Sequence, residues 1–264
     1  MSPGAFDSAP PATALADRLA FSLWLPAAVA ATLTTAVGRL LAAEELARWA
    51  VLAAAGSFVI YGIDRLRDLA RDRHTSPRRT AFIERNRNAF AIALAIAGLG
   101  LVLAAAGSPP TTLALCGVFG SVGLLHRRLK RFPALKSVYV SIAWTGICVG
   151  LPWLAAPGAT PREALALTAI LFPTFWANLV ASNLRDDEAA LGPTPALGLA
   201  RGALILALGV TWLVPRDLAP LAWVPALELL ALARFRPTEH YGHLAVDGAL
   251  LAGGLATLVH ASLA

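Results

Sequence analysis

The sequence predicts an all-α integral membrane protein, a helical bundle with roughly nine transmembrane helices at about 20 residues for each crossing. Of its 264 residues, 57% are hydrophobic and 14% are charged, whereas a soluble domain carries about 25% charged residues. The mean hydropathy of +0.65 agrees with a membrane protein. A disordered chain is excluded, because such chains are poor in hydrophobic residues. A disulfide-stapled secreted domain is excluded too, because Cys116 and Cys148 lie inside apolar runs.

Charged residues and clusters of proline and glycine divide the chain into nine candidate spans. We expect residues 1–17, which are rich in glycine, proline and alanine, to form a flexible cytoplasmic segment. They lack the basic residues of a signal peptide, so the first apolar run is expected to be a retained span. The rest, 18–264, is expected to be a single transmembrane domain with pseudo-repeated halves, 18–126 and 137–264. A proline and Glu228 weaken the eighth span, so eight spans with one re-entrant segment stay open. The spans cover 19–38, 47–63, 88–107, 111–126, 137–156, 164–183, 196–214, 218–233 and 244–263.

The basic residues are distributed unevenly over the connections between these spans. Of the 22 Arg and Lys residues, 16 follow spans 2, 4, 6 and 8, and four follow spans 1, 3, 5 and 7. The positive-inside rule places the first set in the cytoplasm, with the N-terminus inside and the C-terminus outside. We therefore expect a multi-pass protein of a bacterial inner membrane. The pI near 10.1 reflects this topology rather than nucleic-acid binding.

Span 2 runs into three aspartates spaced four residues apart, Asp64, Asp68 and Asp72. If the helix continues past the membrane surface, these carboxylates lie on one face. Like charges at this spacing repel one another and favour a cation between them. One interpretation is a solvated ladder in which Arg67 and Arg71 neutralise the aspartates. The other is a magnesium site, because Mg²⁺ usually takes one or two carboxylates together with substrate phosphate oxygens.

A second acidic helix end follows span 6. The tripeptide Leu-Arg-Asp at 184–186 repeats the one at 66–68, an offset of 118 residues. Because both follow even-numbered spans, both emerge on the same side of the membrane, where they can converge on one site. Asp186, Asp187 and Glu188 make this end acidic.

The connection after span 4 is strongly basic. Arg127, Arg128 and Lys130 follow this span, and Lys136 precedes the next one. One interpretation is an ordinary juxtamembrane segment that contacts anionic lipid. The other is a clamp for a phosphorylated ligand, since Arg and Lys bind phosphate oxygens directly. Together with the two acidic helix ends, this loop favours a diphosphate–Mg²⁺ site at the cytoplasmic face.

These three elements resemble those of the UbiA superfamily of intramembrane prenyltransferases, of which the chain looks like a divergent member. The first motif of that superfamily is N-D-x-x-D-x-x-x-D. The corresponding stretch, 60–68, keeps Asp64 and Asp68 but not the leading Asn-Asp. The stretch 131–136, which leads toward Trp144, is similar to the superfamily's loop after helix 4.

The second motif resembles the variant typical of the menaquinone branch, N-N-x-R-D-x-x-x-D. The corresponding stretch begins at Ser182 and keeps Asn183, Arg185 and Asp186, whereas Ala190 replaces the last aspartate. Both motifs are therefore incomplete. Asp72 and Asp187 are candidates for the missing ligands.

The resemblance implies Mg²⁺-dependent transfer of an isoprenyl group from an isoprenyl diphosphate to an aromatic or quinone-like lipophilic acceptor. The implied catalytic residues are Asp64, Asp68 and Asp186. The implied metal ligands are Asp64, Asp68, Asp72, Asn183, Asp186 and Asp187. The implied substrate-binding residues are Tyr61, Arg127, Arg128, Lys130, Lys136, Trp144, Asn178, Asn183 and Arg185.

Other functions stay open at this point. A terpene cyclase of the same superfamily would use the same diphosphate chemistry. The incomplete motifs also allow a catalytically silent protein that binds an isoprenoid, a pigment or a partner subunit. A small transporter would use Glu228 and Asp247, but the polar residues gather at span ends, whereas transporter sites lie near the midplane. Glu239, His240 and His243 have metal-ligand chemistry, at a spacing that is a weak signal.

Overall fold

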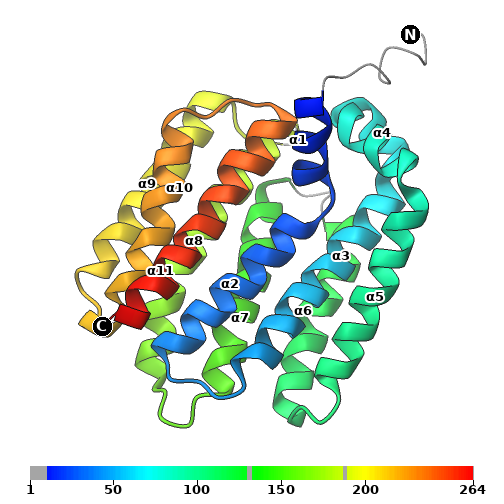
Figure 1. Ribbon diagram of the computed structural model, residues 1–264. Coiled ribbons are helices and arrows are strands. Elements are labelled where there is room, and N and C mark those ends of the chain that lie inside the picture. Colours follow the sequence, from blue (N-terminus) through cyan, green and yellow to red (C-terminus); the bar gives the residue numbers. More distant parts are fainter. Residues whose placement is uncertain (1–10, 130–132, 187–188, 264) are drawn as a thin grey trace.

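The computed structural model describes residues 11–129, 133–186 and 189–263, and every regular element in these ranges is helical (Figure 1). The predicted all-α class is therefore confirmed. A helix lies in each predicted span: α2 (Trp24–Leu40), α3 (Leu46–Thr75), α5 (Arg87–Ala105), α6 (Pro110–Leu129), α7 (Pro133–Leu154), α8 (Pro161–Arg185), α9 (Pro193–Thr211), α10 (Trp223–Ala233) and α11 (Gly248–Leu263). Shorter elements are α1 (Pro11–Phe21), α4 (Pro77–Arg85), the 3-10 helix η2 (Arg216–Ala222) and the π-helix η3 (Tyr241–Asp247).

Not all of these helices have the length of a membrane span. Within the described ranges, six helices are long and apolar enough to cross a membrane, and the bent pair of α1 and α2 would make a seventh. The apolar part of α6 is shorter, and α10 has only 11 residues. The predicted count of nine spans is therefore not confirmed.

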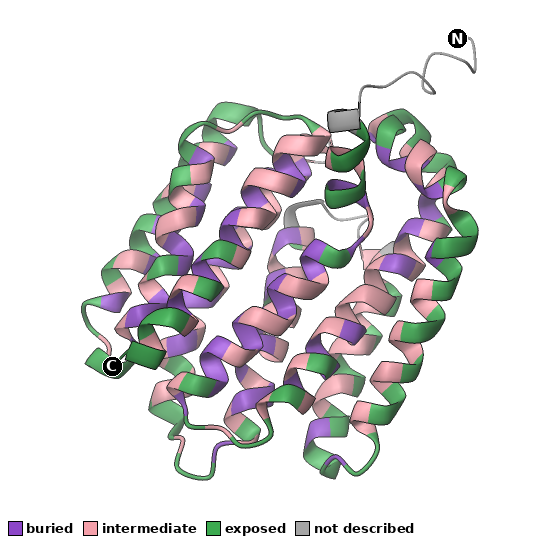
Figure 2. Cartoon of the chain, in the orientation of Figure 1, coloured by how far each residue is buried: buried purple, intermediate pink, exposed green. Residues whose placement is uncertain are grey.

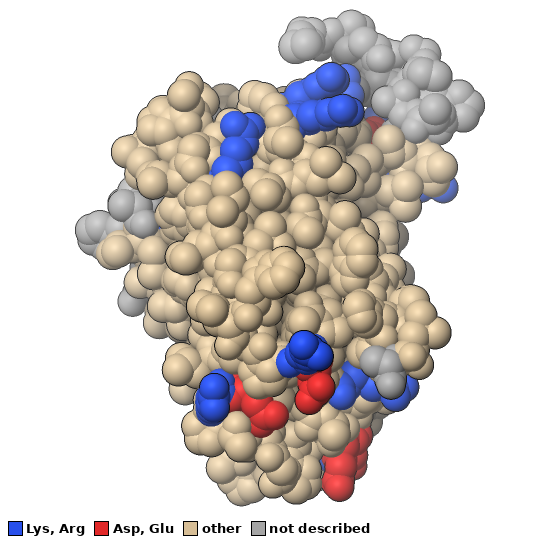
Figure 3. All heavy atoms as spheres, turned by 90° about the vertical axis from the view of Figure 1, so that its left-hand side faces the viewer, with Lys and Arg blue, Asp and Glu red and all other residues tan. Residues whose placement is uncertain are grey.

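The outer surface of the bundle is apolar. Ile92, Ile96, Leu99 and Leu103 recur every three or four residues along α5, and each is at least 60% exposed (Figure 2). On the face shown in Figure 3, charged side chains gather at the two ends and leave a broad uncharged band between them. Soluble monomers rarely expose such a surface, which is suited to lipid. The protein is a multi-pass integral membrane protein.

The chain bends where the first predicted span was expected to be continuous. α1 begins at Pro11, before the expected domain boundary at residue 18, and meets α2 at 50°. At the bend, Leu23 has a φ of 66°, a left-handed conformation that a leucine rarely adopts. Arg65 of α3 donates a hydrogen bond of 3.1 Å to the carbonyl oxygen of Phe21. This bond satisfies a carbonyl at the end of α1 that has no partner within its own helix.

Helices α3 and α8 carry the two predicted acidic ends. α3 is 30 residues long and continues through all three of its aspartates, as the spacing required. α8 starts at a capping box, in which the Thr160 hydroxyl accepts from the Glu163 N–H and the Glu163 carboxylate accepts from the Thr160 N–H. A buried apolar cluster joins α8 to α2, α7, η2 and α11. Both acidic ends lie at the same end of the bundle as α4, and α11 ends at the opposite side (Figure 1).

Candidate functional site

A cavity of 420 Å³ lies among α3, α6, α7, α8 and the η3–α11 segment. Apolar side chains such as Val29, Leu52 and Ile147 line one part of it, and charged side chains from α3, α4, α7, α8 and η3 line the other. Ten of the predicted site residues are among the lining residues: Tyr61, Asp64, Asp68, Asp72, Lys136, Trp144, Asn178, Asn183, Arg185 and Asp186. Of the other four, Arg127 and Arg128 belong to the last turn of α6, whereas Lys130 and Asp187 lie outside the described residues.

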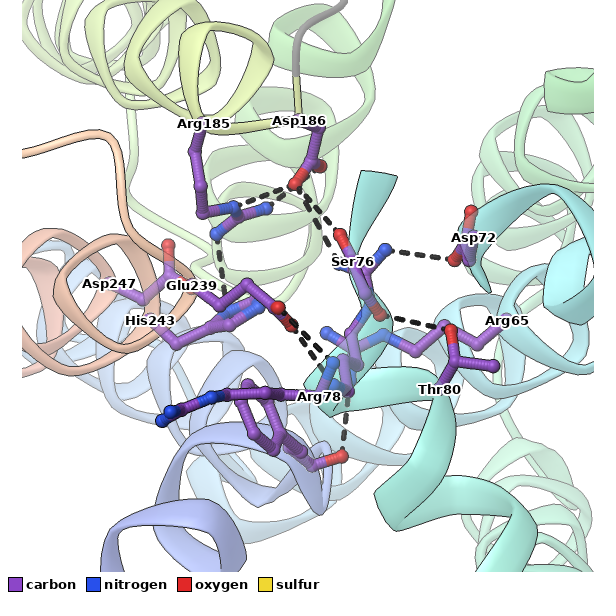
Figure 4. A network of polar contacts seen from close by, with 12 residues as sticks. Arg65, Asp72, Ser76, Arg78, Thr80, Arg185, Asp186, Glu239, His243 and Asp247 are labelled. Carbon is purple, nitrogen blue, oxygen red and sulfur yellow. Dashed lines mark hydrogen bonds and ion pairs between the residues drawn. The ribbon is translucent and has the colours of Figure 1, made fainter. Parts of the chain in front are cut away.

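The end of α3 is paired with α4 through an arginine. Nη2 of Arg79 donates a hydrogen bond of 2.8 Å to the carboxylate of Asp72. The backbone N–H groups of Arg78 and Arg79, in the first turn of α4, donate to the Glu239 carboxylate at 3.3 and 2.9 Å (Figure 4). An anion at a helix N-terminus is stabilising, so Glu239 holds α4 in this position.

The end of α8 carries a second ion pair. Arg185 donates from Nε and Nη2 to the two carboxylate oxygens of Asp186, at 2.8 and 3.0 Å (Figure 4). Nη1 of Arg79 lies 3.9 Å from the same carboxylate. Burial by itself raises the pKa of Asp186, but Arg185 outweighs this effect, with contributions from Arg79 and Lys136, and holds the pKa below its usual range. Asp186 is therefore a carboxylate at neutral pH.

A polar cluster extends from this ion pair into the bundle. His243 of η3 lies with Nδ1 3.4 Å from Nη1 of Arg185 and 3.1 Å from the Asp247 carboxylate. The Asn178 amide donates to both Asp247, at 3.2 Å, and Glu228, at 3.3 Å. Glu228 is fully buried on α10. Hydrogen bonds and ion pairs thus connect Glu228 to Asp186.

An aromatic wall flanks the charged part of the cavity. Nε1 of Trp144 donates a hydrogen bond of 2.9 Å to the hydroxyl of Tyr61. The Trp144 ring packs against Phe175 with 5.4 Å between ring centroids. All three residues line the cavity. Aromatic faces of this kind attract and stabilise a cation.

Asn183 occupies a more enclosed position than the carboxylates. Its Nδ2 donates a hydrogen bond of 2.9 Å to Ser137 on α7. Its Oδ1 is buried and has no hydrogen-bond partner among the described residues. Asn183 therefore offers one amide oxygen at the end of α8.

The aspartates differ in how well they fit a magnesium ion. Asp64 and Asp68 lie one helical turn apart on α3 and both line the cavity. Two carboxylates of this kind, with substrate phosphate oxygens, fit the usual coordination of Mg²⁺. Asp72 and Asp186 pair with Arg79 and Arg185, respectively. In the part of the chain that the structure describes, no three His, Cys, Asp or Glu side chains form a group that could hold a metal ion.

The histidines after α10 have separate partners. His240 lies 2.7 Å from Asp17 of α1, and His243 is joined to Asp247. The sequence singled out Glu228, Asp247 and His243 one by one but gave no sign that Asn178 connects them. It also missed Arg79, which is one of eight basic residues in the connection after span 2.

The fold and the site together define a class: a helical membrane protein with two acidic helix ends and basic side chains around one cavity. The family model for the UbiA prenyltransferase family matches residues 22–241. The chain belongs to the UbiA prenyltransferase family, and the resemblance predicted from its motifs is confirmed.

A solved structure agrees with this assignment at the level of the fold. The apo structure of a UbiA homolog from Aeropyrum pernix K1 matches with a TM-score of 0.63 and 17% sequence identity. The match covers 88% of this chain and 98% of that one. No curated protein matches the chain.

Proposed function

We propose that this protein is an intramembrane prenyltransferase that moves an isoprenyl group from an isoprenyl diphosphate to an aromatic or quinone-like lipophilic acceptor. The observation that carries this proposal is the division of one cavity into a charged part and an apolar part. An isoprenyl diphosphate has the same division, with a polyanionic head and a hydrocarbon chain. Membership of the UbiA prenyltransferase family supports the same reaction class.

In this proposal the charged part binds the diphosphate. Arg79, Lys136 and Arg185 line it and are able to contact phosphate oxygens. Asp64 and Asp68 would hold Mg²⁺, which, when bound, neutralises charge on the departing diphosphate. The isoprenyl chain would lie along the apolar part of the cavity, where burial of hydrocarbon is favourable.

The aromatic wall stands beside the reacting carbon in this arrangement. Cleavage of the allylic C–O bond leaves the electron pair on the diphosphate and a carbocation on the isoprenyl group. The faces of Tyr61 and Trp144 would stabilise that cation until a carbon of the acceptor attacks it. The acceptor carbon then loses its proton to the departed diphosphate or to water, which restores the acceptor ring. Phe175 packs against Trp144 and also lines the cavity, so it extends the apolar wall and would help to keep out water that traps the cation.

We propose further that the charged end of the bundle faces the cytoplasm, with the N-terminus inside and the C-terminus outside. The basic connections support this orientation, because most basic residues flank the ends of α3 and α6. A reporter fused after Ala81 is expected to be cytoplasmic and one fused at Ala264 external. A cytoplasmic C-terminal reporter would contradict the orientation.

Thermal unfolding of the detergent-solubilised full-length protein tests the ligand class. Mg²⁺ with an isoprenyl diphosphate should raise Tm, because a ligand that binds only the native state stabilises it by mass action. The Asp64→Asn/Asp68→Asn variant should fold and lose this shift. Asp217→Asn is the control, because Asp217 is an exposed carboxylate in η2, outside the cavity. A shift that persists in the double variant would place the site elsewhere.

A further inference from the structure

Guanidinium groups lie between the acidic ends of α3 and α8 and pair with their carboxylates. We propose that Arg79 and Arg185 take the place of a metal ion beside Asp186 and bind a phosphate group directly. At most one divalent cation then binds in the cavity, at Asp64 and Asp68. That the phosphate belongs to an isoprenyl diphosphate rests on the function proposed above; the arginine site itself does not.

Arg79 occupies the position between the two acidic ends. Its Nη2 lies 2.8 Å from Asp72 on α3 and its Nη1 lies 3.9 Å from Asp186 after α8. Its side chain is only 9% exposed. A bridging cation between these carboxylates would have to lie where this guanidinium group lies. The positive charge that two facing carboxylates require is therefore supplied by the chain itself.

Both carboxylate oxygens of Asp186 already accept hydrogen bonds from a cationic group, so a metal ion would have to compete with it. The fork of Arg185 engages both of its carboxylate oxygens, the strongest geometry for an arginine–carboxylate pair. The hydroxyl of Ser76 also donates a hydrogen bond of 3.5 Å to one of these oxygens. Asn183, the other predicted ligand here, offers a single neutral oxygen. One such oxygen does not hold a divalent cation against two neighbouring guanidinium groups, which repel it.

The arginines retain donors for a ligand. A guanidinium group carries five N–H donors, and Asp72 and Asp186 engage only some of those on Arg79. Its Nε is buried and has no hydrogen-bond partner among the described residues. Both arginines line the cavity, as does Lys136. Arg79, Arg185 and Lys136 therefore present N–H donors from which phosphate oxygens could accept hydrogen bonds.

The position of Arg79 depends on a distant part of the chain. Glu239, which precedes η3, accepts from the first-turn N–H groups of α4. Gly242 of η3 lies against Arg185, and a Cβ there would lie 2.8 Å from Nη1 of Arg185. The segment 239–243 therefore positions both arginines. Because α4, α8 and η3 each contribute to it, the pair of arginines takes up this arrangement only in the folded protein.

A count of bound cations tests the metal half of the proposal. Mn²⁺, as a paramagnetic substitute for Mg²⁺, is titrated into the full-length protein with inorganic pyrophosphate and followed by electron paramagnetic resonance. We expect one Mn²⁺ per chain, lost in Asp64→Asn/Asp68→Asn and kept in Asp186→Asn. Two ions per chain, with one lost in Asp186→Asn, would overturn the proposal. The count on the unmodified protein decides the matter if a variant does not fold.

Binding of pyrophosphate without metal tests the anion half. In EDTA, the unmodified protein should bind pyrophosphate, and Arg79→Gln should weaken binding at least about tenfold, the scale of a hydrogen bond between charged groups. Arg78→Gln is the matched control, because the neighbouring Arg78 is exposed and contributes its backbone N–H to the network. Arg79→Lys, which keeps the charge without the fork, should retain partial binding. Binding that requires metal, or equal binding by Arg79→Gln, would overturn the proposal.

These outcomes separate the arginine site from the proposed function, because neither experiment uses an isoprenyl group. Metal-free pyrophosphate binding without any prenyl transfer would support the site and contradict the transferase. A complete lack of bound Mn²⁺ would contradict the magnesium site at Asp64 and Asp68 and agree with the absence of one at Asp186.

Discussion

The hydroxyl of Tyr61 accepts a hydrogen bond of 2.9 Å from the indole nitrogen of Trp144, across 83 residues of sequence. Tyr61 stands where the family's first motif carries an aspartate, so an aromatic ring replaces a carboxylate at this position. The ring completes the wall that Trp144 and Phe175 form along the cavity. The departure from the motif therefore has a structural role: it extends the apolar part of the cavity toward Asp64.

Tyr61→Phe should lower the stability of the protein while keeping the ring. The partly buried Trp144 N–H then loses its acceptor beside the cavity, and the cost should not exceed the about 1–3 kcal/mol of a fully buried unpaired donor. Thermal unfolding of Tyr61→Phe, Trp144→Phe and the double variant measures the coupling between the two residues. The double variant should recover part of the loss, whereas strictly additive effects would show that the hydrogen bond is unimportant.

Gly242→Ala should disturb the ion pair at the end of α8. A Cβ at this position would overlap with Cδ of Arg185 and lie 2.8 Å from its Nη1, so the Arg185 side chain that holds Asp186 would have to shift. We expect a lower Tm and weaker pyrophosphate binding. Gly248→Ala is the control, because nothing lies within 4 Å of a Cβ at that position. Equal effects of the two substitutions would exclude the close contact as the cause.

Acid should remove the stability that Asp186 contributes. The pKa of Asp186 is lower in the folded protein than in the unfolded chain, chiefly because Arg185 outweighs the effect of burial. The contribution is therefore complete above the unfolded pKa of about 3.9 and is lost as the pH falls below it. The difference in unfolding free energy between the unmodified protein and Asp186→Asn should be constant from about pH 6 to 8 and shrink in acid. A difference that grows on acidification would contradict this sign.

Replacing Asn178 by alanine or by aspartate should lower the stability of the protein. The amide nitrogen of Asn178 donates one hydrogen bond to the carboxyl group of Glu228 and one to that of Asp247 inside the bundle. Asn178→Ala removes both donors and should cost about 1–3 kcal/mol for each unsatisfied group. Asn178→Asp adds a third carboxyl group and should lower Tm further. An Asn178→Asp protein as stable as the unmodified one would show that the cluster does not depend on this amide.

The sequence predicted the helices well because apolar periodicity is a local property. Each span in the sequence contains a helix in the structure, and the spacing of Asp64, Asp68 and Asp72 placed them on one helix. The bend at Leu23 was not predictable in the same way. Pro26 in the first turn of α2 is compatible with a helix start but does not specify a bend. The carbonyl oxygen of Phe21 is satisfied by Arg65, which is 44 residues further along the chain.

Long-range pairing explains what the sequence could not show about the site. Asp64, Asp68 and Asp72 were found because their spacing is periodic, and Asp186 because the tripeptide that it ends repeats the one at 66–68. Arg79 was not, because its neighbours in the sequence are equally basic and its orientation depends on Glu239, 160 residues further along. The contact of Asn178 with Asp247 likewise joins residues 69 positions apart.

Release of diphosphate by the full-length protein tests the central proposal most directly. The donors are dimethylallyl, geranyl, farnesyl and geranylgeranyl diphosphate, each with and without quinone-precursor acceptors. We predict release that requires an acceptor and that falls at least about a hundredfold in Asp68→Asn, the scale for removing one electrostatic group from a transition state. Release without acceptor, giving a cyclic product, would indicate a cyclase instead. No aspartate-dependent release from any donor would contradict the transferase and favour a silent member of the family.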